Sequence, residues 1–515
     1  MDRSPRRWLA LAALTLAVLI VALDGTVINV ALPTLSAELG ADSAQLQWIG
    51  GGYLLALSVA MLPVGLLGDR YGHKRLLLAG VGLFGVASLV GASVHSTGAV
   101  IAVRAVLGLG AAMILPLSMA VLPRIFDQEE LPRAIGVWTA ATALGMPVGP
   151  VVGGWLLNHF WWGSVFLFNV PVAALALVAG LWLLPADPSR GSAGANPRAP
   201  FDSLGTVLGV LGITALVYGT IQAAGQGWGD PVVLSTLGAG VLLLAVFLRH
   251  ERRFAHPLVD LGLFADARFR WGAVIAVFVN FAVMGILFVV PQYLEAVLGN
   301  DAFGTGLRVL PLIVGLMLSA AVSEALVPRL GVRVVVPTGL LLLAGGAFLG
   351  GTAGTGDGYG FTALWLSLTG LGFGVAVVPA TSMVIQSLPS ERTGAGTSLL
   401  ETVQQLGSVL GVAALGTLLS LGYHARLHLG GLPADAAHSA RESVTAAGAV
   451  AERLGDPALG TTAHAAFVHG MDLVLLFCGA VALLTALAAA LRLPRRTAAP
   501  GPAAEEVPAV VAAAR

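Results

Sequence analysis

The chain has 515 residues, of which 57% are hydrophobic and only 10% are charged, with a net charge of zero. Soluble globular proteins carry about 25% charged residues, so this chain has too few charges to cover a water-exposed surface, and most of its surface must face lipid. The balanced charge gives no indication of a nucleic-acid partner. The single cysteine, Cys478, allows neither an internal disulfide nor a thiolate metal cluster. The single lysine, Lys74, does not lie in a GxxxxGK[ST] phosphate loop, so the protein cannot hydrolyse ATP by that route. Any energy that it uses must come from an ion gradient.

The first apolar run begins at Trp8, after Arg6 and Arg7, and continues beyond Leu32. The apolar part of a secretory signal is about 7–15 residues, so we expect this run to be a retained first helix. A spanning helix needs about 20 mostly apolar residues, and helices satisfy their own backbone groups in lipid. The sequence predicts such helices at 8–32, 46–68, 76–95, 99–122, 134–157, 164–184, 203–223, 231–249, 271–293, 305–328, 334–353, 360–384, 396–420 and 469–491.

The distribution of arginines predicts the orientation. With a cytoplasmic N-terminus, the outer segments hold only Arg308 and three arginines of the 421–468 loop, as the positive-inside rule requires. Both termini are then cytoplasmic. We expect the 185–202 segment to be a flexible cytoplasmic linker, the 421–468 loop to be extracellular with short amphipathic helices, and the 497–515 tail to be disordered.

An internal repeat divides the chain. The segment Leu107–Gly110 matches Thr369–Gly372 at an offset of 262 residues, and Gly145 and Gly149 match Gly407 and Gly411 at the same offset. Parallel repeats build transporters whose two halves rock around a central site. The sequence therefore predicts a six-helix bundle at 1–184, two inserted helices at 203–249 and a second six-helix bundle at 271–491.

Two glycine-rich segments are candidate moving parts. Gly65, Asp69, Arg70, Gly72 and Lys74 lie on the inner loop between the second and third predicted helices, where they form a candidate conformational latch. The alternative is a basic loop that only sets topology. In the fifth predicted helix, the spacing of Gly145, Gly149, Pro150, Gly153 and Gly154 favours close helix packing and a bend.

These segments carry a specific resemblance. The inner loop resembles the signature GxLaDrxGrkxxl of the major facilitator superfamily, and 145–154 resembles the antiporter motif gxxxGPxxGG. The segments 23–33, 162–171 and 401–407 are similar to the fourteen-helix drug:proton antiporters that export quaternary ammonium compounds and dyes. The resemblance implies an all-α membrane fold of two six-helix bundles plus two inserted helices, and export rather than uptake. One departure is Leu107, where the fourth-helix motif RxxqGxgaa has glutamine.

Four charged residues lie within predicted spans, where a charge is costly and marks a functional site by default. They are Asp24, Arg104, Glu324 and Glu401. We expect Asp24 and Arg104 to couple protons, and Glu401 and Glu324 to bind a cationic substrate. The alternatives are a static Asp24–Arg104 pair, an Arg104 that only braces helices, and a Glu324 capped at the interface near Arg329. Glu401 aligns with Thr139 of the first repeat, so the fold alone does not require an acid there.

Aromatic side chains within the spans are candidates for contact with a lipophilic cation, or else ordinary packing residues. They are Tyr53, Trp138, Phe278, Phe281, Phe288 and Trp365. No catalytic constellation, metal site or cofactor motif is expected, so the chain is not expected to be an enzyme. The sequence predicts a proton-coupled efflux antiporter for small amphipathic cations in the cytoplasmic membrane, with substrate, protons and lipid as its partners and a monomeric state. Export of a neutral antibiotic, a nutrient symporter, and a membrane-embedded enzyme or channel are the alternatives.

Overall fold

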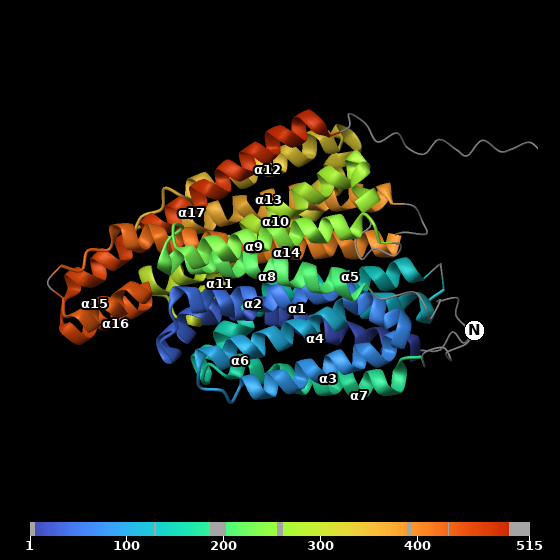
Figure 1. The fold of residues 1–515 in the computed structure, drawn as a ribbon, viewed down its shortest axis with the longest axis horizontal. Helices are drawn as coiled ribbons and strands as arrows, with labels where there is room; N and C mark the ends of the chain where they lie inside the picture. Colours follow the sequence, from blue (N-terminus) through green and yellow to red (C-terminus); the bar gives the residue numbers. More distant parts are fainter. Residues whose placement is uncertain are drawn as a thin grey trace, which may run out of the picture.

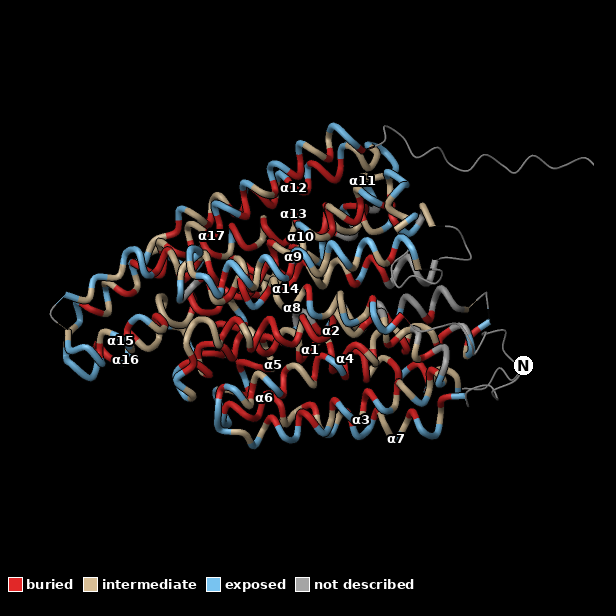
Figure 2. The backbone as a smooth tube through the Cα atoms, viewed as in Figure 1, coloured by how far each residue is buried: buried red, intermediate tan, exposed pale blue. Residues whose placement is uncertain are grey.

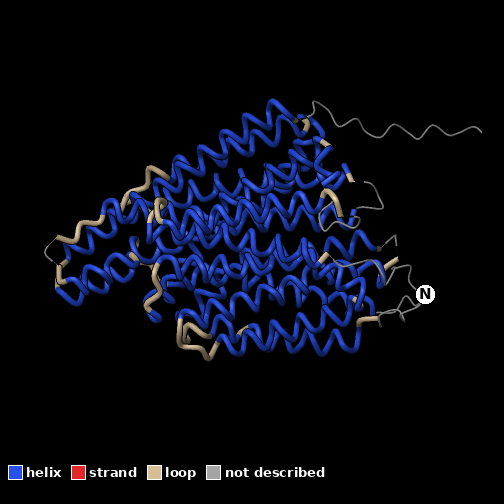
Figure 3. The backbone as a smooth tube through the Cα atoms, in the orientation of Figure 1, coloured by secondary structure: helices blue, strands red, loops and turns tan. Residues whose placement is uncertain are grey.

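The computed structural model describes residues 6–127, 130–185, 202–254, 261–388, 393–430 and 432–493, and these residues form helices and short connections without strands (Figure 3). The α-helices of the first half of the chain are α1 Arg6–Leu39, α2 Ser43–Tyr71, α3 His73–Gly91, α4 Thr97–Ile125, α5 Leu131–His159, α6 Ser164–Leu167 and α7 Asn169–Leu183. Two helices follow, α8 Ser203–Gln226 and α9 Pro231–Glu251. The second half contains η1 Leu261–Ala265, α10 Ala267–Gln292, η2 Tyr293–Val297, α11 Ala302–Leu330, α12 Val332–Gly350, α13 Tyr359–Ser387, α14 Thr393–Arg426, α15 Ala434–Glu442, α16 Val444–Leu454 and α17 Pro457–Arg492.

Each predicted span falls on helix, but several helices are longer than expected. Among the described residues, twelve helical segments are long and apolar enough to cross a membrane. The predicted loop 421–468 is wrong in its limits, because α14 continues to Arg426 and α17 begins at Pro457. Hydropathy detects only the part of a helix in hydrocarbon, whereas the 36 residues of α17 extend over about 54 Å. The expected linker 185–202, apart from its end residues, and the tail 497–515 lie outside the described residues.

The long helices run roughly side by side, and α15 and α16 project beyond one end of the bundle (Figure 1). We call this end the α15 end and the opposite one, where α1 begins, the N-terminal end. Chain connectivity places the start of α14 at the N-terminal end and the starts of α2 and α11 at the α15 end. The buried residues form a continuous core along the inner faces of the helices (Figure 2).

The repeat seen in the sequence is present in the packing of α4 and α13. A methyl group on Gly108 would overlap the carbonyl oxygen of Tyr53 in α2, and one on Gly370 would overlap that of Leu312 in α11. Only glycine permits this backbone approach. Helices α2 and α4 thus meet as α11 and α13 do, at positions matched by the repeat.

A second matched contact joins α5 to α1 and α14 to α10. Gly145 lies against Ala22 in the first half, and Gly407 lies against Val277 in the second. Both pairs of helices therefore cross at a glycine of the repeated motif. The offset between the contacted residues, 22 and 277, is 255, which relates positions of α1 to positions of α10.

The helices α8 and α9 form a hairpin on the outside of this arrangement. Helix α8 packs against α2 and α14, and α9 packs mainly against α8. Only 11% of the apolar window of α9 is buried, and Val241 and Leu242 are 62% and 65% exposed. A helix with so much exposed apolar surface is stable only in a medium such as lipid.

Candidate functional site

The first part of the site is a buried ion pair between α1 and α4. The Arg104 Nη1 donates to Asp24 Oδ2 at 2.6 Å, and the two side chains are 1% and 3% exposed. The Nε of Arg104 donates to the carbonyl oxygen of Ile49 at 3.1 Å, and its guanidinium lies 4.2 Å from the ring centroid of Tyr53. The arginine therefore has a carboxylate, a carbonyl and an aromatic face as partners, which offset the loss of its hydration.

Asn169 is a further member of this cluster that was not predicted from the sequence. Asn169 lies at the start of α7, fully buried, and its Nδ2 donates to Asp24 Oδ1 at 3.0 Å. The same nitrogen lies 3.3 Å from the hydroxyl of Ser88 in α3. Both oxygens of Asp24 are thus hydrogen-bonded, one to a cation and one to an amide. The sequence signal was a polar residue inside the 162–171 motif.

The repeat shows that the fold does not need these charges. Asp24 corresponds to Val279 at the offset of 255, and Arg104 corresponds to Leu366 at the offset of 262. Val279 and Leu366 are 1% and 0% exposed, so the second half builds the equivalent region from hydrocarbon. Since buried pairs are weak contributors to stability, a charged pair here points to function.

Glu401 lies on α14 about two turns from its start, and it is exposed. It shares a helix face with Gln404 and Ser408, since these positions follow at i+3 and i+7. One turn further, Val412 of the same face lies against Gly50 and Gly51 of α2. Glu401 therefore lies on the side of α14 that faces α2 of the first half.

The other predicted substrate residues do not gather around Glu401. Trp138 is buried and donates from Nε1 to the Ser118 hydroxyl at 3.0 Å, which joins α5 to α4. Phe281 is partly buried, with its ring centroid 6.4 Å from that of Phe477. Trp365 is fully buried against Gly350 of α12. The side chain of Glu324 lies outside the described residues.

Tyr53, also expected to bind substrate, belongs to the ion-pair cluster instead of an open surface. It is 2% exposed, and its hydroxyl lies 3.4 Å from the carbonyl oxygen of Val21 in α1. Its position below the guanidinium of Arg104 makes it a partner of the charged pair.

The candidate latch lies at the N-terminal end of the bundle. Gly72 joins α2 to α3 with φ of 104°, a conformation that favours glycine. Lys74 Nζ donates to the carbonyl oxygens of Leu181 and Leu184 at 3.1 and 2.7 Å, near the end of α7. Gly65 has open space around it, and the side chains of Asp69 and Arg70 lie outside the described residues.

The candidate antiporter motif on α5 lies between two helices. Gly149 and Gly153 adjoin Thr26 and Val27 of α1, where even a methyl group would be too close. Gly154 adjoins the backbone of α11 at Ala302, and the carbonyl of Pro150 adjoins Gly306. The motif thus fixes α5 to α1 within the first half and also to α11 of the second half.

The α15 end is closed where the halves meet. Asn158 at the end of α5 bonds Asp301 at the start of α11, and hydrogen bonding with Asn158 holds the pKa of Asp301 below its ordinary 3.8. The hydroxyls of Ser36 and Ser443 are 3.0 Å apart, and the Ser43 hydroxyl donates to the Glu442 carbonyl at 2.7 Å. Helices α15 and α16, although part of the second half, are therefore bound to α1 and α2.

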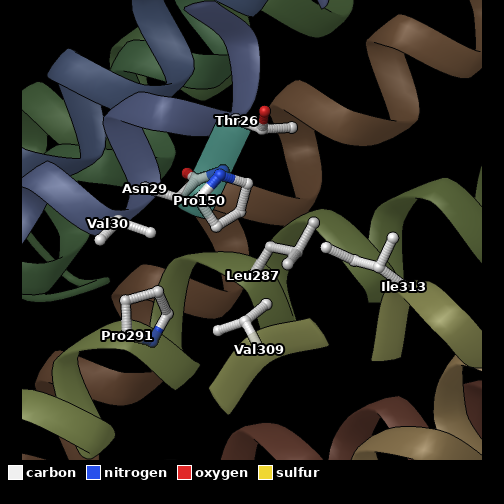
Figure 4. A pocket seen from close by; sticks show the side chains of 8 residues that line it. All are labelled: Thr26, Asn29, Val30, Pro150, Leu287, Pro291, Val309 and Ile313. Carbon is white, nitrogen blue, oxygen red and sulfur yellow. The ribbon is translucent and has the colours of Figure 1, made fainter. Parts of the chain in front are cut away.

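Below this contact the central passage is filled by side chains. Figure 4 shows residues of α1, α5, α10 and α11 around a cavity of only ≈ 10 Å³. They are Thr26, Asn29, Val30, Pro150, Leu287, Pro291, Val309 and Ile313. This volume holds at most about one water molecule, so the space between these four helices has no room for a substrate. The contact between the halves is therefore closed toward the α15 end.

Comparison with known proteins places the chain in a family. The model of the major facilitator superfamily matches residues 14–412. The chain belongs to the major facilitator superfamily. It is 35% identical to the tetracenomycin C resistance and export protein of Streptomyces glaucescens over 94% of this chain and 91% of that protein. It is also 35% identical to the methyl viologen resistance protein SmvA of Salmonella typhimurium, over 94% and 97%.

A third relative in this superfamily, the multidrug efflux pump LfrA of Mycolicibacterium smegmatis, is 33% identical over 91% of this chain and 93% of that protein. Among solved structures, a bacterial homologue of the lysosomal transporter Spinster in an inward-facing conformation has a TM-score of 0.70. It is 18% identical and covers 96% of this chain and 100% of its own. The fold is thus that of a multi-pass membrane transporter.

Proposed function

We propose that this chain exports small amphipathic cations from the cell in exchange for protons. The observation that carries the proposal is the Asp24–Arg104 pair, buried where the second half has Val279 and Leu366. The relatives support export, because their names describe resistance, export and efflux. The absence of a catalytic constellation from the sequence favours a transporter over a membrane-embedded enzyme or channel.

We infer fourteen membrane crossings, with two six-helix bundles and the α8–α9 hairpin between them. Beyond the twelve segments identified by length and composition, α2 and α5 each have 29 residues, about 43 Å of helix. Both pack along other long helices, α2 on α4 and α14, and α5 on α1 and α11. With the N-terminal end in the cytoplasm, as the arginine distribution favours, Glu401 lies in the cytoplasmic half of α14.

A proton on Asp24 would neutralise the carboxylate and remove the attraction that holds Arg104. The guanidinium would then bind another acceptor, and the contact between α1 and α4 would change. Each pH unit across the membrane supplies about 1.4 kcal/mol per proton, and each charge crossing 100 mV adds about 2.3 kcal/mol. One or two protons per cycle therefore support a substantial substrate gradient.

Glu401 is proposed to attract the cationic part of the substrate, because it is an exposed acid between the halves. We expect Glu401→Gln to reduce export of the divalent cation methyl viologen more than export of the monovalent ethidium. Gln404→Ala, on the same helix face, serves as a neutral control. Efflux is measured in inverted vesicles under an imposed pH gradient. An equal loss for both cations would remove charge recognition from Glu401, and unchanged export of both would remove Glu401 from the site.

A second candidate function is export of a neutral antibiotic. The similarity to the tetracenomycin C resistance and export protein favours it. A drug-susceptibility panel in an efflux-deficient host separates the two. Protection against cationic dyes alone supports the first function, and protection against neutral antibiotics alone supports the second.

A further inference from the structure

A separate cavity of ≈ 220 Å³ lies where the α8–α9 hairpin meets α2 and α14. Its walls include Val210 and Ile213 of α8, Phe247 of α9, Phe264 of η1 and Val403 of α14. These residues lie in the parts of their helices nearest the N-terminal end. The cavity is thus outside the passage between the halves, under the inserted hairpin.

Small residues on α8 leave this space open. Gly205, Thr206 and Gly209 line the cavity along the first turns of α8. Toward the α15 end, Val217 and Ile221 of the same helix are buried against α2 and α14 and leave no comparable room. The sequence of α8 therefore changes from filling residues to small residues where the cavity begins.

The cavity is distinct from the site at Glu401. Leu399, Val403 and Leu406 of α14 line it, whereas Glu401 does not. With 3.6 residues per turn, these positions lie roughly opposite Glu401 on the helix. Helix α14 therefore has the proposed substrate site on one face and this cavity on the other.

The lining suits a hydrocarbon chain and not a cation. Two of its hydroxyls are bound within their own helix: Ser58 Oγ donates to the Leu54 carbonyl at 2.6 Å, and Thr206 Oγ donates to the Asp202 carbonyl at 2.8 Å. No charged residue is among the described residues that line it. The carboxylates of Asp202 and Glu251 lie beside Gly205 at one end of the cavity, and that of Asp202 is already paired with His250. The rest of the lining offers no counter-charge for the lost hydration of a cation. An apolar cavity of about 150 Å³ already binds benzene, so this one has room for a longer part of an acyl chain.

Arginines adjoin the cavity at the N-terminal end. Arg249, Arg252 and Arg253 follow Phe247 closely in the chain and are exposed. Arg270 is also exposed, and its Nη1 donates to the carbonyl oxygen of Phe264 at 3.2 Å. At this end of the helices the arginines lie at the level of the lipid headgroups. Their guanidinium groups can donate charge-assisted hydrogen bonds to a lipid phosphate.

We propose that the cavity binds an anionic phospholipid, with one acyl chain in the space under α8 and its phosphate on Arg252, Arg253 and Arg270. The exposed α9 places the surrounding lipid directly beside this site. The bound chain touches both α2 and α14, which form one of the contacts between the halves. This site requires no particular exported substrate.

The test is retention of lipid by the full-length purified protein, measured by native mass spectrometry after exposure to phosphatidylglycerol or phosphatidylcholine. Val210→Trp fills the cavity, with Leu242→Trp on the lipid-facing side of α9 as its control. Arg252→Gln with Arg253→Gln removes two charges, with Arg426→Gln near the α15 end as its control. At about fivefold per arginine, the double variant should lose roughly 25-fold in preference for phosphatidylglycerol.

We expect Val210→Trp to lose bound phosphatidylglycerol and both controls to retain it. Equal retention of the two lipids by the wild-type protein would overturn the choice of an anionic lipid. Unchanged retention in both test variants would overturn the site itself. A photoactivatable acyl chain on phosphatidylglycerol tests the site in the wild-type protein, without any variant. Labelling should fall within the lining segments 58–63, 205–213, 247–248, 261–264 or 399–406, and labelling that falls only outside these segments would refute the proposal. Because lipid binding is measured without transport, these outcomes are independent of the proposed export activity.

Discussion

The second half has Val279 and Leu366 at the positions of Asp24 and Arg104. Exchanging the charged pair for valine and leucine therefore tests whether the pair serves folding or transport. The single change Asp24→Val leaves Arg104 buried without its carboxylate, which costs about 3–5 kcal/mol in comparable sites. We expect the lower end, about 3 kcal/mol, because the Ile49 carbonyl and the Tyr53 ring still contact the guanidinium. Arg104→Leu leaves Asp24 with only a neutral amide partner, so we expect about 4–5 kcal/mol.

The double variant Asp24→Val with Arg104→Leu should recover most of this loss. Burying two apolar side chains in place of a buried pair is often neutral or stabilising, so we expect stability within about 1 kcal/mol of wild type. The two changes then show a coupling energy of at least about 6 kcal/mol, because the single losses add to about 7 kcal/mol or more and the double variant loses at most about 1 kcal/mol. Unfolding in bicelles measures stability, and efflux from inverted vesicles under a pH gradient measures transport.

The expected result is a stable double variant that does not couple export to protons. Wild-type transport by the double variant would show that the pair only holds helices together. A double variant as unstable as the single ones would refute the correspondence with Val279 and Leu366 on which the argument rests.

Three further predictions follow from the packing and the orientation. Gly149→Ala should lower stability by roughly 1–3 kcal/mol through overpacking against α1, whereas Gly345→Ala, with open space around it, should be neutral or slightly stabilising in thermal unfolding. A cysteine at the exposed Asp435 should react with an impermeant thiol reagent from outside the cell and one at Arg252 only in inverted vesicles; the reverse pattern contradicts the orientation. The pKa of Asp301 is lower in the folded protein than in the unfolded chain. The stabilisation by its carboxylate is therefore present above the unfolded pKa and is lost only as pH falls through the lower folded pKa. Crosslinking of α5 to α11 should be constant from pH 5 to 8, and a decline within that range would contradict this pH dependence.

The sequence was sufficient for the helices and for the charged pair. Apolar windows located the helices because lipid requires long apolar segments, and the cost of charge in lipid identified Asp24 and Arg104. It did not identify Asn169, because a neutral amide carries a smaller penalty and its partner is 145 positions away. Nor did it assign Tyr53 correctly to its surroundings, because an aromatic residue in a span has the same pattern whether it meets a substrate or a guanidinium.

The positions of the helix ends and the closure of the α15 end also could not be predicted from the sequence. Alanine-rich and polar residues extend α14 and α17 past the apolar windows, and such residues are equally common in loops. The contact between Ser36 and Ser443 joins segments 407 positions apart, and no local pattern specifies it. The glycine repeat predicted long-range packing better than the polar residues did. A glycine at matched positions of the two halves indicates that another helix backbone lies close to it in each half.

The closure between α15–α16 and the first half depends largely on neutral groups. Ser36 and Ser443 meet through their hydroxyls, and the Ser43 hydroxyl donates to the backbone carbonyl of Glu442. Dissolved ions screen exposed charge pairs but act only weakly on neutral hydrogen bonds. In the proposed orientation this surface meets the medium outside the cell, so this part of the closure should hold equally well in dilute and in concentrated salt.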